Sequence, residues 1–112
     1  MSRRDDLIAL RDKVQAGKWR FNGWESHPIN RKSMGKLDDA YSGSVDAALA
    51  LLAAVLPGWH VQHVGQTRAG WVCRIEGEGL SIPYSTKFEP QPTAARALLL
   101  ATLNALIAEA DT

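Results

Sequence analysis

Apolar residues recur with the period of an amphipathic helix near the start of the chain. Leu7, Leu10 and Val14 stand at positions i, i+3 and i+7, and the charged residues 11–13 face away from them. Acidic residues precede this stripe, where negative charge suits a helix dipole, and Gly17 is suited to end the helix. The pattern therefore predicts an amphipathic surface helix in the first part of the chain.

Two later stretches are apolar on almost every side. Ser44 is suited to cap a helix over residues 45–56, which the following Pro-Gly pair then stops. Thr93 has the same capping position before a helix over residues 94–110. Because a helix that is apolar all round is buried on more than one side, we expect the helix over residues 45–56 to lie between layers or against a second copy of the chain. In the helix over residues 94–110 the expected buried stripe is Leu99, Leu103, Leu106 and Ile107.

Between these two helices the pattern changes to strict alternation of apolar and polar residues. Residues 59–64, 71–76 and 80–85 each alternate with period two, and short turns that contain glycine separate them. This pattern predicts an antiparallel three-stranded meander with one face on the core. Pro83 cannot donate a hydrogen bond to a ladder, so the third strand is expected at an edge.

The predicted element order is helix, long loop, helix, three strands and helix, which makes an α+β domain (α-loop-α-β-β-β-α). The length of 112 residues fits a single domain over residues 1–112. Its parts are an N-terminal helix over 1–17, an irregular segment over 18–43 and an α-β-β-β-α core over 44–112. The expected core includes Trp59, Trp71, Leu49, Leu52, Leu99 and Leu103.

Two blocks of this sequence resemble a known family. They read YSGSVDAALALLAAVLPGW at residues 41–59 and PTAARALLLATLNALI at residues 92–107, and together they cover about a third of the chain. Both blocks are similar to the phage ABA-sandwich domain, a family of small phage and prophage proteins with no assigned activity. The resemblance implies a helix–sheet–helix sandwich and a phage or prophage origin, and it implies no reaction. Residues 1–40 do not resemble the usual N-terminal part of that family.

Composition and charge narrow the class of protein. Thirteen Lys and Arg against twelve Asp and Glu give a net charge of +1, which excludes an acidic nucleic-acid mimic and a strongly basic coating protein. One cysteine excludes an internal disulfide. The N-terminus lacks the pattern of a signal peptide, and the longest apolar stretch is too short to span a membrane. We therefore expect a protein of the bacterial host cytoplasm with no membrane partner.

Candidate catalytic and metal-binding residues give only weak signals. His60 and His63 spell H-x-x-H, but in a regular strand they face opposite sides and cannot share a metal. Cys73 alternates in phase with Trp71 and Ile75, which predicts a buried structural thiol. The sequence contains no phosphate-binding loop or nucleophile elbow. We therefore expect a protein that is not an enzyme and that uses no cofactor and no metal.

The segment over residues 18–43 carries large aromatic residues between cations and shows no helical or strand period. Exposed aromatic and basic side chains dominate binding hot spots, so this segment is the predicted recognition surface for a partner. The residues expected to contact the partner are Arg20, Trp24, Arg31, Lys32 and Lys36. Trp19 and Phe21 follow the first helix closely and are expected to be packing residues. The alternative is that most of these aromatic rings simply pack over the sheet or a helix end.

Three functions fit this sequence. The first is a non-enzymatic phage accessory protein that binds and inhibits or redirects a host protein, such as a component of a defence system. The second is a nucleic-acid-binding module, because α-β-β-β-α is the element order of double-stranded-RNA-binding domains. Nucleic acid is not favoured, since the basic cluster that those domains place at the start of the last helix is reduced here to Arg96. The third is a structural domain that works as a homodimer or as one part of a larger assembly. The face of Leu98, Ala101 and Ala105 on the last helix is then a self-association face, and the alternative is that these small residues are mildly exposed.

Overall fold

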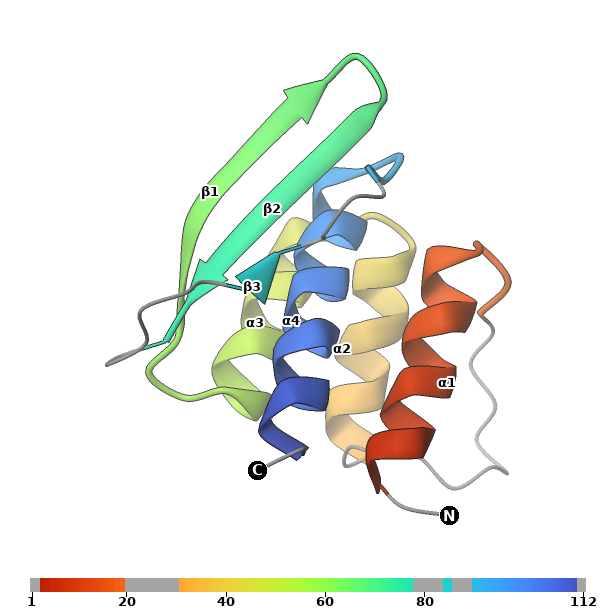
Figure 1. Cartoon of the computed structure of the whole chain (residues 1–112), viewed down its shortest axis with the longest axis vertical. Coiled ribbons are helices and arrows are strands. Elements are labelled where there is room, and N and C mark those ends of the chain that lie inside the picture. The colour runs from red at the N-terminus through yellow and green to blue at the C-terminus, as the bar shows by residue number, and fades with distance from the viewer. Residues whose placement is uncertain (1–2, 20–30, 78–83, 86–89, 111–112) are drawn as a thin grey trace.

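The computed structural model describes residues 3–19, 31–77, 84–85 and 90–110 of the chain. In chain order the elements are α1 (Arg3–Gln15), α2 (Arg31–Tyr41), α3 (Val45–Val55), β1 (His60–Thr67), β2 (Gly70–Glu76), β3 (Tyr84–Ser85) and α4 (Ala94–Ala110). Figure 1 shows the helices side by side with the antiparallel β1–β2 pair lying across them. The predicted α+β class is confirmed, and three of the four described helices lie where the hydrophobic pattern places them.

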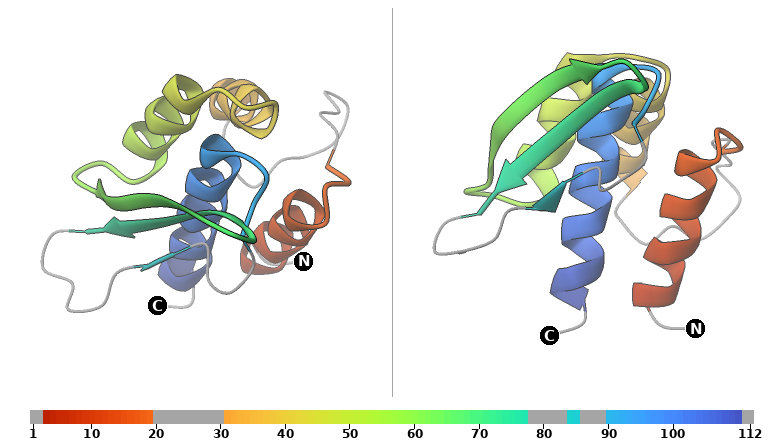
Figure 2. Two further views of the ribbon diagram at one scale, coloured as in Figure 1. Left: turned by 90° about the horizontal axis from the view of Figure 1, so that it is seen from above. Right: turned by 45° about the horizontal axis from the view of Figure 1, so that its top comes forward.

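α4 is the central element of the fold. Every side chain from Ala97 to Ile107 is buried. Figure 2 shows why, because α1, α2, α3 and the sheet surround this helix. The expected stripe of Leu99, Leu103, Leu106 and Ile107 is buried, and the opposite side of the helix is buried as well. Its cover comes from this chain, however, and the buried face of Leu98, Ala101 and Ala105 is not a self-association face.

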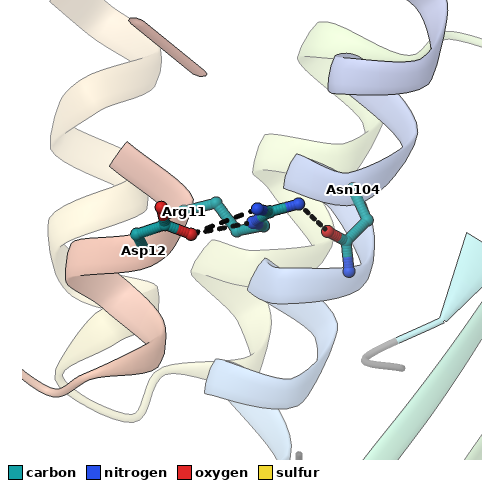
Figure 3. A network of polar contacts seen from close by, with 3 residues as sticks. All are labelled: Arg11, Asp12 and Asn104. Atoms are coloured by element: carbon teal, nitrogen blue, oxygen red, sulfur yellow. Dashed lines mark hydrogen bonds and ion pairs between the residues drawn. The ribbon is translucent and has the colours of Figure 1, made fainter. Parts of the chain in front are cut away.

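α1 packs along α4 through the predicted apolar stripe. Leu7, Leu10 and Val14 are all buried. Arg11 was expected to face outward, but its Nη1 donates a hydrogen bond to Oδ1 of Asn104 on α4 at 3.4 Å (Figure 3). The same guanidinium lies 3.1 Å from the Asp12 carboxylate. A polar contact between Arg11 and Asn104 therefore accompanies the apolar packing of α1 on α4.

α2 corrects the prediction of an irregular segment over residues 18–43. Residues 31–41 form a helix whose buried stripe is Ser33, Leu37 and Ala40, at positions i, i+4 and i+7. Ser33 and Ala40 are small, and Leu37 is the one large apolar residue among the three. In the sequence Met34, Leu37 and Tyr41 stand at positions i, i+3 and i+7, so a short helical period is present and the expectation of no period over residues 18–43 is wrong. Gly35 lowers the helix propensity of these residues. Packing against α3 and α4 therefore stabilises a helix whose own apolar stripe is short.

α3 begins and ends as predicted but is buried on one side only. The backbone N–H of Ala47 donates to Ser44 Oγ at 3.1 Å, which is the expected N-cap. Leu51 and Leu52 are buried, while 43% of Leu49 is exposed. The prediction that Leu49 belongs to the core is therefore wrong, because no described element covers that side of the helix.

The β1–β2 pair is an antiparallel hairpin with a tight turn. Gly70 follows the turn with φ +140°, and a Cβ atom there would lie 2.7 Å from the carbonyl oxygen of Gln91. This close approach places Gln91 beside Trp71. The Trp71 N–H donates to the Gln91 carbonyl oxygen at 2.7 Å, and the Gln91 N–H donates to the Trp71 carbonyl oxygen at 2.8 Å. β3 pairs with β2 through Tyr84 and Ser85. The rest of the predicted third strand, residues 80–83, lies outside the described residues.

The sheet forms an outer layer of the molecule. Cys73 and Ile75 are buried, on the face of β2 that packs against α4. The other face bears polar side chains such as the exposed Arg74. The expected sandwich, with the sheet between helices, is therefore not the arrangement of the described residues: the order of layers is sheet, α4 and then α2 with α3 (Figure 2). Trp59 and Trp71, expected to be buried, are half-buried at the margin of this packing.

A β-bulge between Val61 and His63 reverses the expected faces of the second half of β1. His60 pairs with Glu76 and His63 pairs with Arg74, so the two histidines share the outer face of the sheet. The prediction that they face opposite sides is therefore wrong, because one extra residue in β1 shifts the alternation by one position. The apolar Val61 and Val64 consequently share the inner face, opposite Ile75 and Cys73. These pairings keep the apolar side chains of both strands on the α4 side.

Candidate functional site

Three of the five predicted contact residues lie on α2. Arg31 and Lys32 are in its first turn, and Lys36 follows one turn later. Arg20 and Trp24 lie outside the described residues, as does Phe21. The structure therefore places 11 residues of the predicted recognition segment on a regular helix that packs on α3 and α4.

The side of α2 away from its buried stripe is open. Gly35 is exposed, and a Cβ atom there would meet no atom within 4 Å. Asp39 is exposed one turn further along, and Lys36 is half-buried. We call Gly35, Lys36 and Asp39, together with the helix positions of Arg31 and Lys32, the outer surface of α2. It combines a fixed backbone with charged residues of both signs.

Aromatic packing explains two of the rings in the predicted recognition segment. Trp19 is buried, as expected, and its ring meets the ring of Tyr41 edge-on with 5.5 Å between the centroids. The guanidinium carbon of Arg96 lies 4.2 Å from the centroid of the Tyr41 ring, and its Nη2 donates to the Tyr41 carbonyl oxygen at 3.3 Å. This cluster joins the end of α2 to the start of α4. Sequence spacing could not reveal it, because Tyr41 and Arg96 are 55 positions apart.

The geometry of Arg96 also bears on nucleic-acid binding. Arg96 lies in the first turn of α4, where its own N–H donates to Thr93 Oγ1 at 3.1 Å and closes the predicted N-cap. Its side chain is engaged with Tyr41. The start of the last helix therefore does not present this guanidinium to a phosphate backbone.

The thiol of Cys73 is buried and is not suited to act as a nucleophile. Its side chain is 2% exposed, and burial raises its pKa from 9.0 to about 12. The thiol therefore stays protonated at neutral pH, whereas a nucleophilic cysteine must be available as thiolate. The prediction of a buried thiol beside Ile75 is confirmed.

The outer face of the hairpin brings together the two histidines without forming a metal site. Nε2 of His60 lies 3.9 Å from an oxygen of Glu76 on the neighbouring strand. His63 instead lies over Gly65, where a Cβ atom would be 2.6 Å from its Nε2. Within the described ranges, no three side chains of His, Cys, Asp or Glu come together in a way that could hold a metal ion.

Three large apolar side chains are exposed in a stretch of the sequence that carries little charge. Residues 42–67 contain one charged residue, Asp46, if the histidines are neutral. In this stretch Val45 and Leu49 on α3 are 45% and 43% exposed, and Val64 on β1 is 40% exposed. Sequence reasoning missed the exposed side of α3 because a helix that is apolar all round gives no sign of which side remains uncovered. Such exposed side chains are typical of protein interfaces when they occur together.

Comparison with known proteins leaves the family open. No protein-family model, no curated protein and no solved structure matches this chain. The resemblance to the phage ABA-sandwich domain therefore stays a prediction. Among the described helices, none combines the length and the apolar character needed to cross a membrane.

Proposed function

We propose that this protein acts by binding a host protein, as a non-enzymatic phage or prophage accessory protein that inhibits or redirects its partner. A component of a bacterial defence system is the partner that we favour, in the cytoplasm of the bacterial host. The observation that carries the proposal is the outer surface of α2, where basic helix positions adjoin the open space around Gly35. The phage origin rests on the resemblance of residues 41–59 and 92–107.

The charge pattern of this surface supports a protein partner rather than nucleic acid. Residues 1–40 carry nine basic and six acidic side chains, and Asp38 and Asp39 follow Lys36 on the same helix. Carboxylates repel a phosphate backbone, whose binding rests on cations. A protein surface, in contrast, can match neighbouring charges of both signs, and such matching gives specificity.

A formed helix is a suitable base for recognition. Because α2 is held by Ser33, Leu37 and Ala40, a partner would not have to order its backbone on binding. The preceding segment supplies Arg20 and Trp24, the large side chains that we expect to anchor the partner. Recognition would then combine a rigid basic helix with an aromatic residue from the adjoining chain.

The test is a pull-down from host lysate with tagged protein, with and without nuclease. A prey that remains after nuclease supports protein binding, and loss of every prey would favour nucleic acid. For a retained prey, changing Trp24, Arg31 and Lys32 together to Ala should lower the affinity roughly 30- to 1,000-fold. Thermal unfolding of the same variant shows whether the fold is intact.

A bulky residue in open space gives a sharper variant. Gly35→Trp adds a side chain where no atom lies within 4 Å, so the fold should persist while partner binding is blocked. Ala9→Trp adds the same bulk at an exposed position of α1 and serves as the matched control. If both Trp variants and the triple Ala variant bind like the unmodified protein, the outer surface of α2 is not the binding site.

A further inference from the structure

β1 has a free edge. The strand order is β1-β2-β3, so β1 pairs with β2 on one side, and no strand of the described residues pairs with its other side. Figure 1 shows β1 along the outer margin of the molecule. Unpaired backbone N–H and C=O groups at such an edge are a template for another extended chain.

The register identifies which backbone groups are free. Trp71 pairs with Gln66, but the Trp71 N–H and C=O bond to Gln91 on the other side of β2. The Gln66–Trp71 pair therefore exchanges no ladder hydrogen bonds, and the Gln66 N–H and C=O point away from β2. Because these directions alternate along an antiparallel ladder, the backbone groups of Val64 point the same way.

These free groups are arranged so that a second β1 fits them. Val64 and Gln66 are placed symmetrically about Gly65. An antiparallel copy centred at Gly65 would pair Val64 with Gln66 of the second copy, and Gln66 with Val64 of the second copy. Each pair exchanges two backbone hydrogen bonds in such a ladder. The bulge between Val61 and His63 confines this regular edge to residues 63–67.

The charge of the edge favours a second copy of the same chain. β1 contains no Lys, Arg, Asp or Glu, so two copies bring no permanent like charges together. The strand also lacks the lysine and proline residues that protect many exposed edges. The net charge of the chain is only +1, which gives little repulsion between copies.

Side-chain burial supports the same arrangement. Val64 faces the α4 side of the sheet together with Cys73, yet 40% of it remains exposed because it lies at the margin of the sheet. A strand added at this margin would cover Val64 on its open side. We propose that two copies of this protein pair through antiparallel β1 strands about a twofold axis at Gly65, which makes one continuous sheet. This interface is separate from the outer surface of α2 and does not depend on the host partner.

Sedimentation of the whole protein over a range of concentrations tests the dimer, and two matched variants test its interface. The unmodified chain should sediment as a dimer of a 12.2 kDa protomer. Val64→Lys should raise the dissociation constant of the dimer roughly 30-fold or more. Because the dimer is twofold symmetric, the substitution places two lysines, one from each copy, at the paired β1 strands. Val45→Lys removes a similarly exposed valine from α3 and should leave the dimer intact.

Amide hydrogen exchange gives a readout that needs no variant. The amides of Val64 and Gln66 should be protected only at concentrations where the dimer forms, while His63 and Gly65, bonded towards β2, should be protected at all concentrations. A monomer at 100 micromolar would overturn the proposal, as would a dimer broken by Val45→Lys and not by Val64→Lys. If the amides of Val64 and Gln66 are protected only when a host protein is added, the proposal is also overturned. The β1 edge would then pair with a strand of that host protein. Monomeric Val64→Lys should still capture the α2 partner, so the two proposals can fail separately.

Discussion

At the residue scale, polar and cationic side chains fix the helices around α4. Arg11 reaches from α1 to the buried Asn104, and Arg96 covers the ring of Tyr41 at the end of α2. Each contact has a direction that apolar packing lacks, so it selects one rotation of a helix among several that would bury similar area. The cap residues act more locally: Ser44 and Thr93 each accept the hydrogen bond that their positions in the sequence predict.

The buried thiol provides a pH-dependent prediction. We expect Cys73 in the native protein to react slowly with a thiol reagent from about pH 8 to about pH 10, because burial raises its pKa to about 12. In denaturant its labelling rate should rise over the same range, as the thiol ionises near its ordinary pKa of 9.0. The measurement is the absorbance of the released reagent with time. Fast native labelling near pH 8 would show that Cys73 faces water.

The raised pKa of Cys73 also makes the stability of the protein depend on pH. Below pH 9 the Cys73 thiol is protonated in both states and its contribution to stability is complete. As the pH rises from 9 towards 12 the unfolded state loses the proton first, so the free energy of unfolding decreases. A Cys73→Ala variant should lack this part of the alkaline decrease.

At the element scale, the local pattern predicts a helix or strand well when that element carries its own hydrophobic stripe. α1, α3 and α4 satisfy this condition, and their bounds follow the expected caps and stops. α2 has a shorter stripe of Met34, Leu37 and Tyr41, and Gly35 lowers its helix propensity, so the expectation of an irregular segment overlooked it. In β1 a single bulge moves His63 to the outer face, which no alternation pattern can indicate.

The glycines of two elements give opposite predictions. Gly70→Ala should destabilise the protein by about 2 kcal/mol or more, because φ is +140° and the new Cβ would lie 2.7 Å from the Gln91 oxygen. Gly35→Ala lies in an open part of α2 and should instead stabilise it by about 0.5–1 kcal/mol. Unfolding in denaturant measures both values. A neutral Gly70→Ala would mean that the turn and Gln91 can separate freely.

At the scale of the whole molecule, α4 connects layers that contact one another little. The sheet lies on one side of it, α2 and α3 lie on another, and α1 packs along a third (Figure 2). We expected the sheet to lie between helices, whereas α4 is the central layer. The local sequence pattern does not indicate which layer is central. The candidate site shows the same limit. Sequence chemistry selects Arg31, Lys32 and Lys36, but the open space at Gly35 emerges only from the packing of α2.

This central role predicts where substitutions are most damaging. Leu103→Ala removes a fully buried side chain of α4 and should lower the free energy of unfolding by about 2–5 kcal/mol. Leu49→Ala shortens a leucine that is 43% exposed on α3 and should lower it by less than about 1 kcal/mol. Denaturant titrations at one low protein concentration compare the two. Equal losses would mean that the outer side of α3 is covered.

The location of α4 also affects how the protein is made. Among the described elements this helix is synthesised last, yet α1, α2, α3 and the sheet all pack against it. A ribosome adding roughly 5–20 residues per second therefore delivers the helix after every element that depends on it. Until residues 94–110 emerge, the apolar sides of the earlier helices lack their common support and are accessible to chaperones and proteases. We expect a nascent chain arrested before Ala94 to be degraded, and folding to await the final helix.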